Sequence, residues 1–319
     1  MTVSSVLRNW FRSVGASGLT VVTAEADRIR MAQGEAPAGA RPRVHACSHA
    51  MLDGGRKALA VAARKLRLRG KRYCALLLAP GDYQIQHVEA PDVPPAELKA
   101  AMKWRLKEII DYPLEQVHYD ILDLPAIDGG HARAHFVYAV TAKHEVLRGH
   151  VQRFDDAGLG VSVIDVPETA QRNIAALYEQ ENRGLGMLYL DDHGTLFTIT
   201  YRGELYLARR FDVSMKNLRE AKPEDREDVF NRVLLELQRT LDNFERQFGS
   251  IGVSRIMAGP EPEDTGLITF LNAYLGMPVR RVDLTAVIDA GEGVSLDMET
   301  QWRLFHPIGA TLRSGAQAQ

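Results

Sequence analysis

The stretch MLYLDDHGTLFTITY, residues 187–201, restricts the fold more than any other part of the sequence. An apolar run ends in a polar turn at Gly194, and a β-branched and aromatic run follows it. A second turn, 202–204, leads to a third predicted strand, 205–211. Strand-forming runs separated by glycine turns are typical of antiparallel hairpins. We therefore expect a three-stranded antiparallel sheet in this region.

The first of these turns also carries groups suited to holding a phosphate. Asp192 precedes Gly194, and the hydroxyl of Thr195 follows it. Backbone N–H groups, a hydroxyl and a carboxylate can converge on a phosphate or on its metal ion. A plain hairpin with an acid-rich turn fits the same residues, so both interpretations stay open at this point.

Composition indicates a soluble globular protein with room for two lobes. The chain has 319 residues, of which 45% are hydrophobic and 25% charged,. Its net charge of −2 argues against a protein dominated by nucleic-acid binding,. The two cysteines, Cys47 and Cys74, form no metal-binding spacing and fit a reducing compartment,. The longest apolar run, 73–80, is far shorter than the ~20 residues of a membrane span,. We expect a cytoplasmic protein whose membrane contact is peripheral or made through a partner.

Two basic segments allow a membrane contact as an alternative to an ordinary docked or solvated helix. The N-terminal stretch 3–14 places Trp10 and other apolar residues at helical spacing, with Arg8 and Arg12 on the other side,. A short helix docked on the protein body is the favoured interpretation, and a basic membrane anchor is the alternative. The stretch 56–72 holds eight Lys and Arg residues and no acid. It fits a solvated helix end, or a surface that faces anionic lipid or an acidic partner.

The order of predicted elements shows a duplication. Three strands and a helix come first, an α/β module interrupts the pattern, and a strand and a helix then lead to three strands followed by helices. The predicted strands are 19–24, 28–33, 43–48, 73–78, 83–88, 117–122, 134–141, 160–166, 255–258 and 278–282 beside the hairpin, and the helices are 55–68, 96–110, 144–157, 168–182, 223–247, 266–275 and one from 300 onward. The repeated order predicts an α/β fold of two similar lobes.

Four passages, in this order, resemble a known family. They are 93–120, with its helix and aromatic-proline turn; 139–170, with AVTAK and IDVPETA; 236–260, ending in IMAGP; and 270–279 together with 308–313, IGATLR. Together they resemble the PilM family of actin-like pilus-assembly proteins, in particular its MshI-type members of the mannose-sensitive haemagglutinin (MSHA) pilus system. The resemblance covers most of the chain.

The resemblance implies a fold and a place in a cell. It implies a two-lobed actin-like (ribonuclease-H-like) α/β fold with an inserted PilM-type α/β subdomain. The implied first lobe is 1–71 with 300–319 returning to it, the inserted subdomain is 72–162, and the second lobe is 163–299. It further implies a scaffold of a type IV (MSHA-like) pilus machine at the cytoplasmic face of the inner membrane. Its partners would be the cytoplasmic N-terminal tail of a PilN-type inner-membrane protein and other pilus assembly components.

The implied peptide site lies in a groove between the first lobe and the inserted subdomain. Pockets beside the predicted helix 96–110 suit an extended apolar peptide. We take Trp104 and Tyr112 as candidate anchors, because exposed aromatic side chains dominate binding hot spots. The alternative is that both aromatic residues belong to the core of the subdomain.

The resemblance also locates the nucleotide-binding elements of actin-like ATPases. Matching the second strand of the family to 29–33 places Thr23 where a metal-organising Asp belongs and Glu25 where a Gly belongs. Threonine lacks the charge that holds Mg²⁺, and the carboxylate of Glu25 would repel a polyphosphate. The adenosine loop is reduced to Gly259 followed by proline, which has no N–H. The residues that remain as a weak or vestigial nucleotide site are Asp192, Gly194, Thr195, Glu236, Arg239, Gly259 and Gly309.

These substitutions favour a scaffold that does not hydrolyse ATP. We expect no catalytic residue, no protein-held metal and no cofactor. A Mg-ATP-binding conformational switch or slow ATPase in the same machine is the alternative. An unrelated enzyme is a distant third, because the sequence shows no zinc spacing, no Gly-x-Ser-x-Gly elbow and no complete P-loop,.

Overall fold

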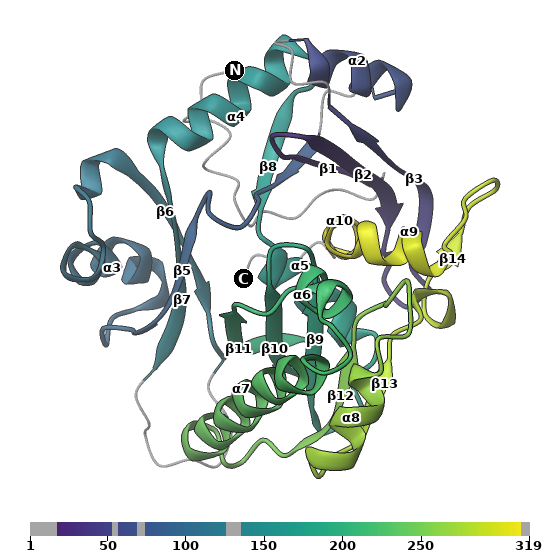
Figure 1. Cartoon of the computed structure of the whole chain (residues 1–319). Helices are drawn as coiled ribbons and strands as arrows, with labels where there is room; N and C mark the ends of the chain where they lie inside the picture. The colour runs from purple at the N-terminus through teal and green to yellow at the C-terminus, as the bar shows by residue number, and fades with distance from the viewer. Residues whose placement is uncertain (1–17, 53–56, 69–73, 126–134, 314–319) are drawn as a thin grey trace. The chain divides into compact units, whose positions relative to one another are not determined.

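The computed structural model describes residues 18–52, 57–68, 74–125 and 135–313. The predicted amphipathic helix at 3–14 lies outside these residues. The described chain forms three sheets with helices packed on them (Figure 1). It divides into two compact units. Unit one contains 22–29 and 50–165, and unit two contains 18–21, 30–49 and 166–313.

The largest sheet has six strands in the order β14-β3-β2-β1-β4-β8. Its strands are β1 (Leu19–Ala24), β2 (Arg28–Glu35), β3 (Arg43–Met51), β4 (Cys74–Leu77), β8 (Val161–Asp165) and the short β14 (Asp289–Ala290). Both β1 and β4 are buried along their whole length, as continuous apolar runs predict for strands covered on both faces,. In unit one, β4 pairs in parallel with β8, and α2 (Ala58–Lys65) contacts α4 (His144–Asp156).

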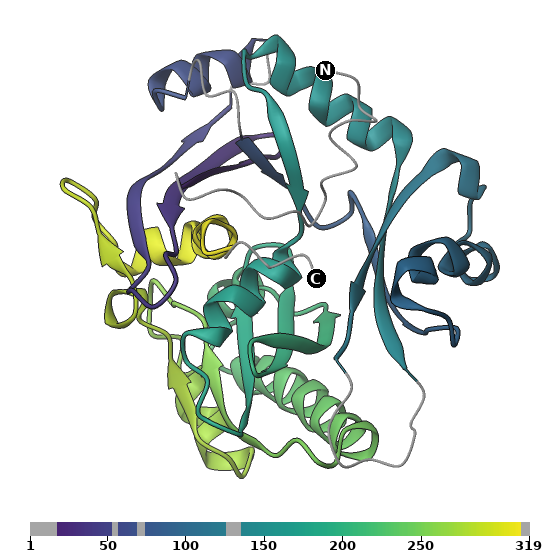
Figure 2. The ribbon, with the colours of Figure 1, turned by 180° about the vertical axis from the view of Figure 1, so that it is seen from behind.

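A three-stranded antiparallel sheet and one helix form the predicted inserted module in unit one. The order is β5 (Gln84–Glu89), β7 (Phe136–Lys143) and β6 (Val117–Asp123). Helix α3 (Pro95–Ile109) covers one face of this sheet, as Figures 1 and 2 show from opposite sides. The helix starts at its second proline because a proline in the first helical turn loses no intrahelical hydrogen bond,. It buries a single narrow stripe, formed by Leu98, Met102 and Leu106.

The predicted hairpin forms the centre of the five-stranded sheet in unit two. The order is β11 (Glu204–Phe211), β10 (Thr195–Tyr201), β9 (Gly184–Leu190), β12 (Val253–Ala258) and β13 (Val279–Arg281). Strands β9, β10 and β11 are antiparallel, and Thr195 pairs with Leu190 on one side and Phe211 on the other. Helix α5 (Pro167–Ala176) packs against all three, and α7 (Arg226–Gln247) packs against β11. The three-stranded antiparallel sheet expected from the sequence is therefore confirmed.

Some helix boundaries differ from the prediction. The helix expected at 168–182 ends at Ala176, and the chain then turns through Asn182, which has the positive φ of 56° that helices exclude,. A short helix that was not predicted, α6 (Met215–Glu220), begins with a capping box between Ser214 and Asn217,. The predicted last helix is two helices, α9 (Met298–Arg303) and α10 (Phe305–Thr311), because the backbone leaves helical geometry at Leu304.

Helix α8 (Leu267–Tyr274) completes the regular elements of unit two beside α7. Two short 3₁₀ turns occur at Leu114–Gln116 and Leu284–Ala286. Among the described residues, no helix combines the length and the apolar character that crossing a bilayer requires.

Candidate functional site

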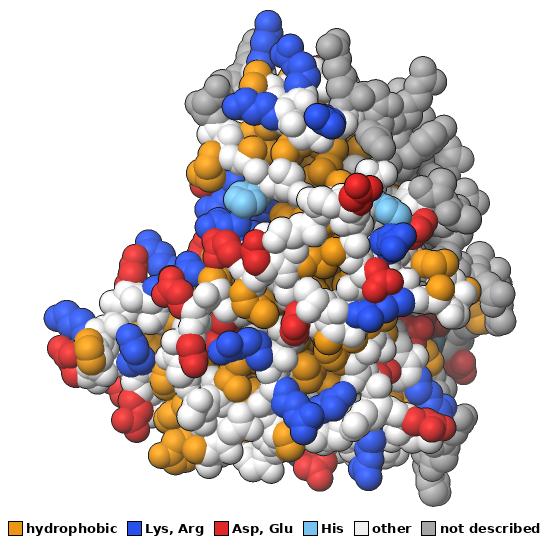
Figure 3. All heavy atoms as spheres, turned by 90° about the vertical axis from the view of Figure 1, so that its right-hand side faces the viewer, with side chains coloured by type: hydrophobic (Ala, Val, Ile, Leu, Met, Phe, Trp, Pro, Cys, Tyr) orange, Lys and Arg blue, Asp and Glu red, His pale blue; other side chains and the backbone are white. Residues whose placement is uncertain are grey.

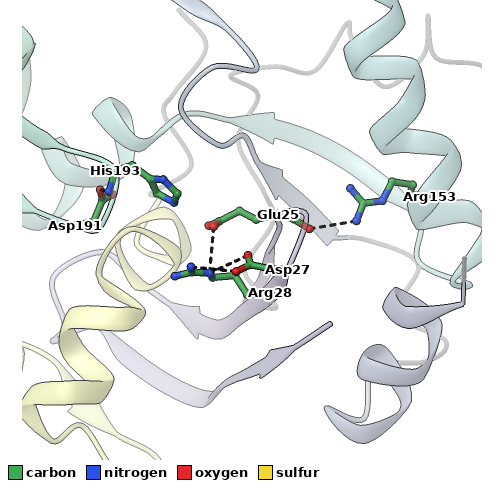
Figure 4. A network of polar contacts seen from close by, with 6 residues as sticks. All are labelled: Glu25, Asp27, Arg28, Arg153, Asp191 and His193. Carbon is green, nitrogen blue, oxygen red and sulfur yellow. Dashed lines mark hydrogen bonds and ion pairs between the residues drawn. The ribbon is translucent and has the colours of Figure 1, made fainter. Parts of the chain in front are cut away.

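The β9–β10 turn in unit two is closed by the side chain of Asp191. Its Oδ1 accepts hydrogen bonds from the backbone N–H of His193 at 2.7 Å and of Gly194 at 3.1 Å. The backbone N–H of Asp191 donates to the carbonyl of Gly194 at 3.0 Å. The two N–H groups that would face a phosphate in a phosphate-binding turn therefore already donate to a carboxylate of the same turn. Figure 4 labels Asp191 and His193 among its sticks.

The acid that bonds to the backbone of this turn is the neighbour of the predicted Asp192. We predicted Asp192 as the acidic group, but the carboxylate that organises the turn is that of Asp191. An Asp whose side chain bonds to the N–H two residues later is a common turn pattern, so the sequence Asp191-Asp192-His193 contained this signal. Gly194 has a φ of +153°, and a Cβ there would lie 3.2 Å from the carbonyl oxygen of Phe211. Glycine at this position fits the backbone of the turn.

The hydroxyl of Thr195 points into the protein. The residue is 1% exposed, and its Oγ1 donates to the carbonyl oxygen of Val213. This hydroxyl joins the β10 strand to the segment that precedes α6. It is not presented at the surface of the turn, where a phosphate or a hydrated metal ion would need it.

Glu236 and Arg239 lie on α7 and have partners within unit two. The carboxylate of Glu236 contacts Arg209 of β11, with 2.6 Å between Oε2 and Nη2. Its other oxygen lies 3.5 Å from Nη1 of Arg239, whose side chain is 67% exposed. Pairs at i and i+3 on an exposed helix surface contribute little to stability. The Glu236–Arg209 pair links α7 to the edge strand β11, whereas the side chain of Arg239 remains in solvent.

The two predicted glycines are required by packing. A Cβ on Gly259 would lie 2.7 Å from the ring of Tyr189, and the N–H of Gly259 donates to the carbonyl of Leu188 at 2.6 Å. A Cβ on Gly309 would collide with the carbonyl oxygen of Ala170, because α10 packs closely on α5. Both glycines therefore have a structural reason that involves no nucleotide.

The residue two positions after Gly259 is a buried acid. Glu261 is 4% exposed, and its Oε2 lies 3.6 Å from Nη2 of Arg281 on β13. Burial raises the pKa of Glu261 to about 7. Arg281 opposes this shift and the nearby Asp264 adds to it. The segment that was expected to face an adenosine thus contains a carboxyl group that titrates near neutral pH.

The β1–β2 turn in unit one has a backbone hydrogen bond from the N–H of Glu25 to the carbonyl of Arg28 at 2.9 Å, and side chains pack around it. Figure 4 shows the guanidinium of Arg28 beside the carboxylates of both Asp27 and Glu25. The distances from Arg28 Nε are 3.1 Å to Asp27 Oδ1 and 3.5 Å to Glu25 Oε2. Arg153 of α4 donates to the backbone carbonyl of Glu25 at 3.3 Å. The side chain of Glu25 is only 11% exposed, so it occupies space inside the turn.

Thr23, at the end of β1, is buried at 5% exposure, and its hydroxyl has no hydrogen-bond partner. A lone hydroxyl is a poor substitute for a carboxylate that holds the water shell of Mg²⁺. In unit one, Thr23 and Glu25 stand at the positions matched to the Asp and Gly of actin-like ATPases. In unit two, the N–H groups of the β9–β10 turn donate to Asp191. Within the described residues, no group of three or more His, Cys, Asp or Glu side chains could hold a metal ion.

The candidate partner residues lie on different sides of α3. Trp104 is 73% exposed, and its position on the helix is opposite the buried stripe formed by Leu98, Met102 and Leu106,. Its side chain therefore does not belong to the core of the module. This removes the alternative interpretation for Trp104.

Tyr112 packs partly against that core. Its hydroxyl lies 3.5 Å from Oγ1 of Thr141, and Nζ of Lys143 lies 5.2 Å from the centre of its ring. Lys143 is the last residue of β7 and immediately precedes α4. Tyr112 thus marks the place where the inserted sheet meets the helix that follows it, and Trp104 marks the outer surface of α3.

No protein-family model and no curated protein matches the sequence. Several solved structures are similar. A chain of the PilM-PilN type IV pilus biogenesis complex matches with a TM-score of 0.73 at 18% identity, over 94% of this chain and 98% of that chain. A Bacteroides thetaiotaomicron protein with an actin-like ATPase fold and unknown function matches with a TM-score of 0.51 at 9% identity, over 90% and 96%. The cytoplasmic domain of EpsL, an inner-membrane component of the Vibrio cholerae type II secretion system, gives 0.47 at 15% identity, over 91% and 95%. The chain therefore has the actin-like fold that the sequence predicted.

Proposed function

We propose that this protein is an assembly scaffold of a type IV pilus machine. In this proposal it lies at the cytoplasmic face of the inner membrane and binds the cytoplasmic N-terminal tail of a PilN-type protein. The observation that carries the proposal is the structural match to nearly the full length of a chain from a PilM-PilN complex. The four sequence passages that resemble the PilM family support it. The narrower assignment to an MshI-type protein of an MSHA pilus rests on the sequence resemblance alone.

The surface of the inserted module is suited to binding a peptide. Trp104 supplies an exposed aromatic side chain, and Tyr112 supplies a half-buried ring beside Lys143. Aromatic residues of this kind contribute most of the affinity in many interfaces. Because the two rings lie on different sides of α3, one small pocket does not hold both. A tail that contacts both must extend around the helix.

The test is a calorimetric titration of the purified protein with a synthetic peptide of the PilN-type tail. We expect micromolar affinity, roughly −8 kcal/mol. Trp104→Ala and Tyr112→Ala should each weaken binding by about tenfold or more, as hot-spot residues do. Tyr274→Ala is the matched control, because Tyr274 is an exposed aromatic residue, 60% exposed, on α8 of unit two.

Each outcome of the titration decides something. Unchanged affinity in one aromatic variant removes that residue from the site, and unchanged affinity in both rejects the assignment of the surface. Failure of the wild-type protein to bind the peptide contradicts the proposed partner. A loss in Tyr274→Ala as large as in the other variants would move the binding surface to unit two.

We further propose that the scaffold works without Mg-ATP. The carboxylate of Asp191 binds the N–H groups of its own turn, Glu25 fills the β1–β2 turn, and Thr195 donates to Val213. Each of these contacts engages a hydrogen-bonding group, or fills a space, that a bound nucleotide would need. The alternative, a Mg-ATP-binding switch or slow ATPase, is favoured by one observation, the survival of an Asp-x-x-Gly-Thr turn between β9 and β10.

A thermal melt with and without millimolar Mg-ATP separates the two functions. A micromolar site would add about 4 kcal/mol at a thousandfold excess of ligand, which is plainly visible as a higher Tm. We expect no shift. The double variant Thr23→Asp, Glu25→Gly is expected to gain affinity if unit one lost its site by these two changes. A Mg-dependent shift in the wild-type protein would instead establish the switch.

A further inference from the structure

The outer face of α2 in unit one is strongly cationic. Lys57, Val61, Arg64 and Lys65 are exposed and lie at the spacing that places residues on one side of a helix, while Ala58, Leu59, Ala62 and Ala63 are buried on the other side,. Arg67, just past the end of the helix, is also exposed. We call Lys57, Arg64, Lys65 and Arg67 the α2 cations. They surround Val61, an apolar side chain that is 39% exposed.

The α2 cations have no acidic partners among the residues that the structure describes. None of the four forms an ion pair with any acid among the described residues, and the sequence contains no Asp or Glu from 54 to 81. Figure 3 shows Lys and Arg side chains gathered over α2 at the top of the view, with no acidic side chain of a described residue among them. Lower on the same face, acidic and basic side chains are interspersed.

Other cations of the chain are placed differently. Arg209 and Arg210 contact the carboxylates of Glu236 and Glu168 at 2.6 and 2.9 Å, and Lys99 contacts Asp120 at 2.6 Å. The protein as a whole carries a formal charge of −2. The α2 face is therefore a local concentration of positive charge on a slightly acidic protein, and this charge is available to an external anion.

We propose that the outer face of α2 contacts an anionic membrane surface directly. The exposed side of a helix offers no groove for a peptide, whereas a flat layer of anionic headgroups can meet all the α2 cations at once. Long Lys and Arg side chains reach headgroups while the apolar Val61 between them faces the bilayer. This contact goes beyond the proposed function because it needs no partner protein, and it does not depend on PilN-type binding.

The expected binding is weak and depends on charge. Each Lys or Arg near an anionic surface contributes about a fivefold factor, so four residues give a preference of about 500-fold for anionic over neutral vesicles. The attraction extends over a Debye length, which falls from about 10 Å at 0.1 M salt to about 3 Å at 1 M. Binding should therefore disappear at high salt.

The experiment is cosedimentation of the full-length protein with vesicles. One set consists of phosphatidylcholine alone, and the other of phosphatidylcholine and phosphatidylglycerol in a ratio of about 2:1, both at low salt. The test variant carries Lys57→Gln, Arg64→Gln and Lys65→Gln, which should lower binding to anionic vesicles about 100-fold. These positions are exposed and glutamine is a good helix former, so the variant should fold with an unchanged Tm,.

Two further variants are controls. Lys57→Arg, Arg64→Lys, Lys65→Arg keeps the charge and should bind like the wild-type protein. Lys103→Gln, Arg105→Gln, Lys107→Gln removes the same number of exposed cations from α3 and should also bind like the wild-type protein.

Several results would overturn the proposal. They are wild-type protein that does not bind anionic vesicles, equal binding to neutral vesicles, full binding by the α2 glutamine variant, or loss only in the α3 variant. If the α2 variant binds vesicles normally but loses affinity for the PilN-type peptide, α2 is a protein-docking face. Failure to bind the peptide, with vesicle binding intact and dependent on α2, would count against the proposed partner and leave the membrane contact standing.

Discussion

The β1–β2 turn and the β9–β10 turn occupy matching places in a duplicated order of elements, but they satisfy their polar groups in different ways. In the first turn, the Arg28 guanidinium lies between the Asp27 and Glu25 carboxylates. In the second, the carboxylate of Asp191 accepts two backbone N–H groups. Both turns have a backbone hydrogen bond across them, to which the first adds contacts between side chains and the second adds contacts from a side chain to the backbone.

This difference shows that the two turns satisfy their polar groups with residues of their own. A backbone N–H group donates either to water or to an acceptor of the protein, and here the exposed His193 and the partly buried Gly194 both donate to Asp191. A carboxylate from the same turn supplies the acceptor in unit two, and an arginine balances the intruding glutamate in unit one. The polar groups of both hairpins that these contacts involve thus have partners within the same turn.

The largest effect is expected at Gly309, a residue that the sequence analysis placed in the nucleotide site beside the β9–β10 turn. Gly309→Ala should destabilise the protein by about 3 kcal/mol, because its Cβ collides with the Ala170 carbonyl between α10 and α5,. Urea denaturation measures this change. The control is Gly149→Ala on α4. An added Cβ there would have no atom within 4 Å apart from its own helix backbone and chain neighbours, so alanine should stabilise the helix slightly,. A tolerated Gly309→Ala would mean that packing does not require this glycine.

The buried carboxyl group of Glu261 should make the stability of unit two depend on pH. Its pKa in the folded protein is about 7, above the ordinary 4.5, so the folded state binds more protons than the unfolded state between these pH values. Its contribution is therefore complete below about pH 4.5 and is lost as the pH rises through 7,. Relative to Glu261→Gln, the wild-type protein should lose about 2 kcal/mol between pH 5 and pH 8. Denaturation curves at both pH values measure this, with Glu263→Gln as the exposed control. A constant difference between the two proteins would contradict the assignment.

Asp191→Ala tests the turn of unit two. Loss of the acceptor leaves two N–H groups without their carboxylate, and we expect about 1.5 kcal/mol of destabilisation. Asp191→Asn should cost less because the amide oxygen can still accept a hydrogen bond. The comparison variant is Asp192→Ala, which should have the smaller effect in the same thermal melts. If Asp192→Ala lowers the Tm more than Asp191→Ala does, Asp192 contributes more than Asp191 to the stability of the turn.

Thr23→Val tests the turn of unit one and should have the smallest effect. Its buried hydroxyl has no partner, so replacing it with a methyl group of similar size should stabilise the protein by about 1 kcal/mol,. Val21→Thr nearby on β1, which places a hydroxyl in a fully buried apolar site, is the opposite control and should destabilise,. Destabilisation by Thr23→Val would show that this hydroxyl does have a role.

Much of the fold was predictable because it rests on local patterns. The glycine turn at 194 between two runs of strand-forming residues predicted β9 and β10, and the two prolines at 94 and 95 predicted the start of α3. The end of α5 was not predictable, since the chain after Ala176 keeps residues that tolerate a helix. The split between α9 and α10 at Leu304 likewise depends on how both helices dock in unit two.

The candidate site divides in the same way. The hypothesis that Thr23 and Glu25 weaken a nucleotide site comes from residue type, because charge and the presence of a Cβ belong to the residue itself, and it stays a prediction. The roles of Asp191 and Gly309 could not be predicted from residue type, because a carboxylate oxygen or a missing Cβ acquires meaning only from the atoms beside it.

The sequence by itself predicted the hairpins and the duplicated order of elements, and its resemblance to the PilM family implied the actin-like fold. The hairpins follow from periodicity and turn chemistry, which act over a few residues. The tertiary structure alone decided that Trp104 is exposed, that Asp191 rather than Asp192 closes its turn, and that Gly309 serves helix packing. The exposure of a side chain and the packing around a glycine depend on the three-dimensional arrangement of atoms, and a local sequence pattern does not predict them.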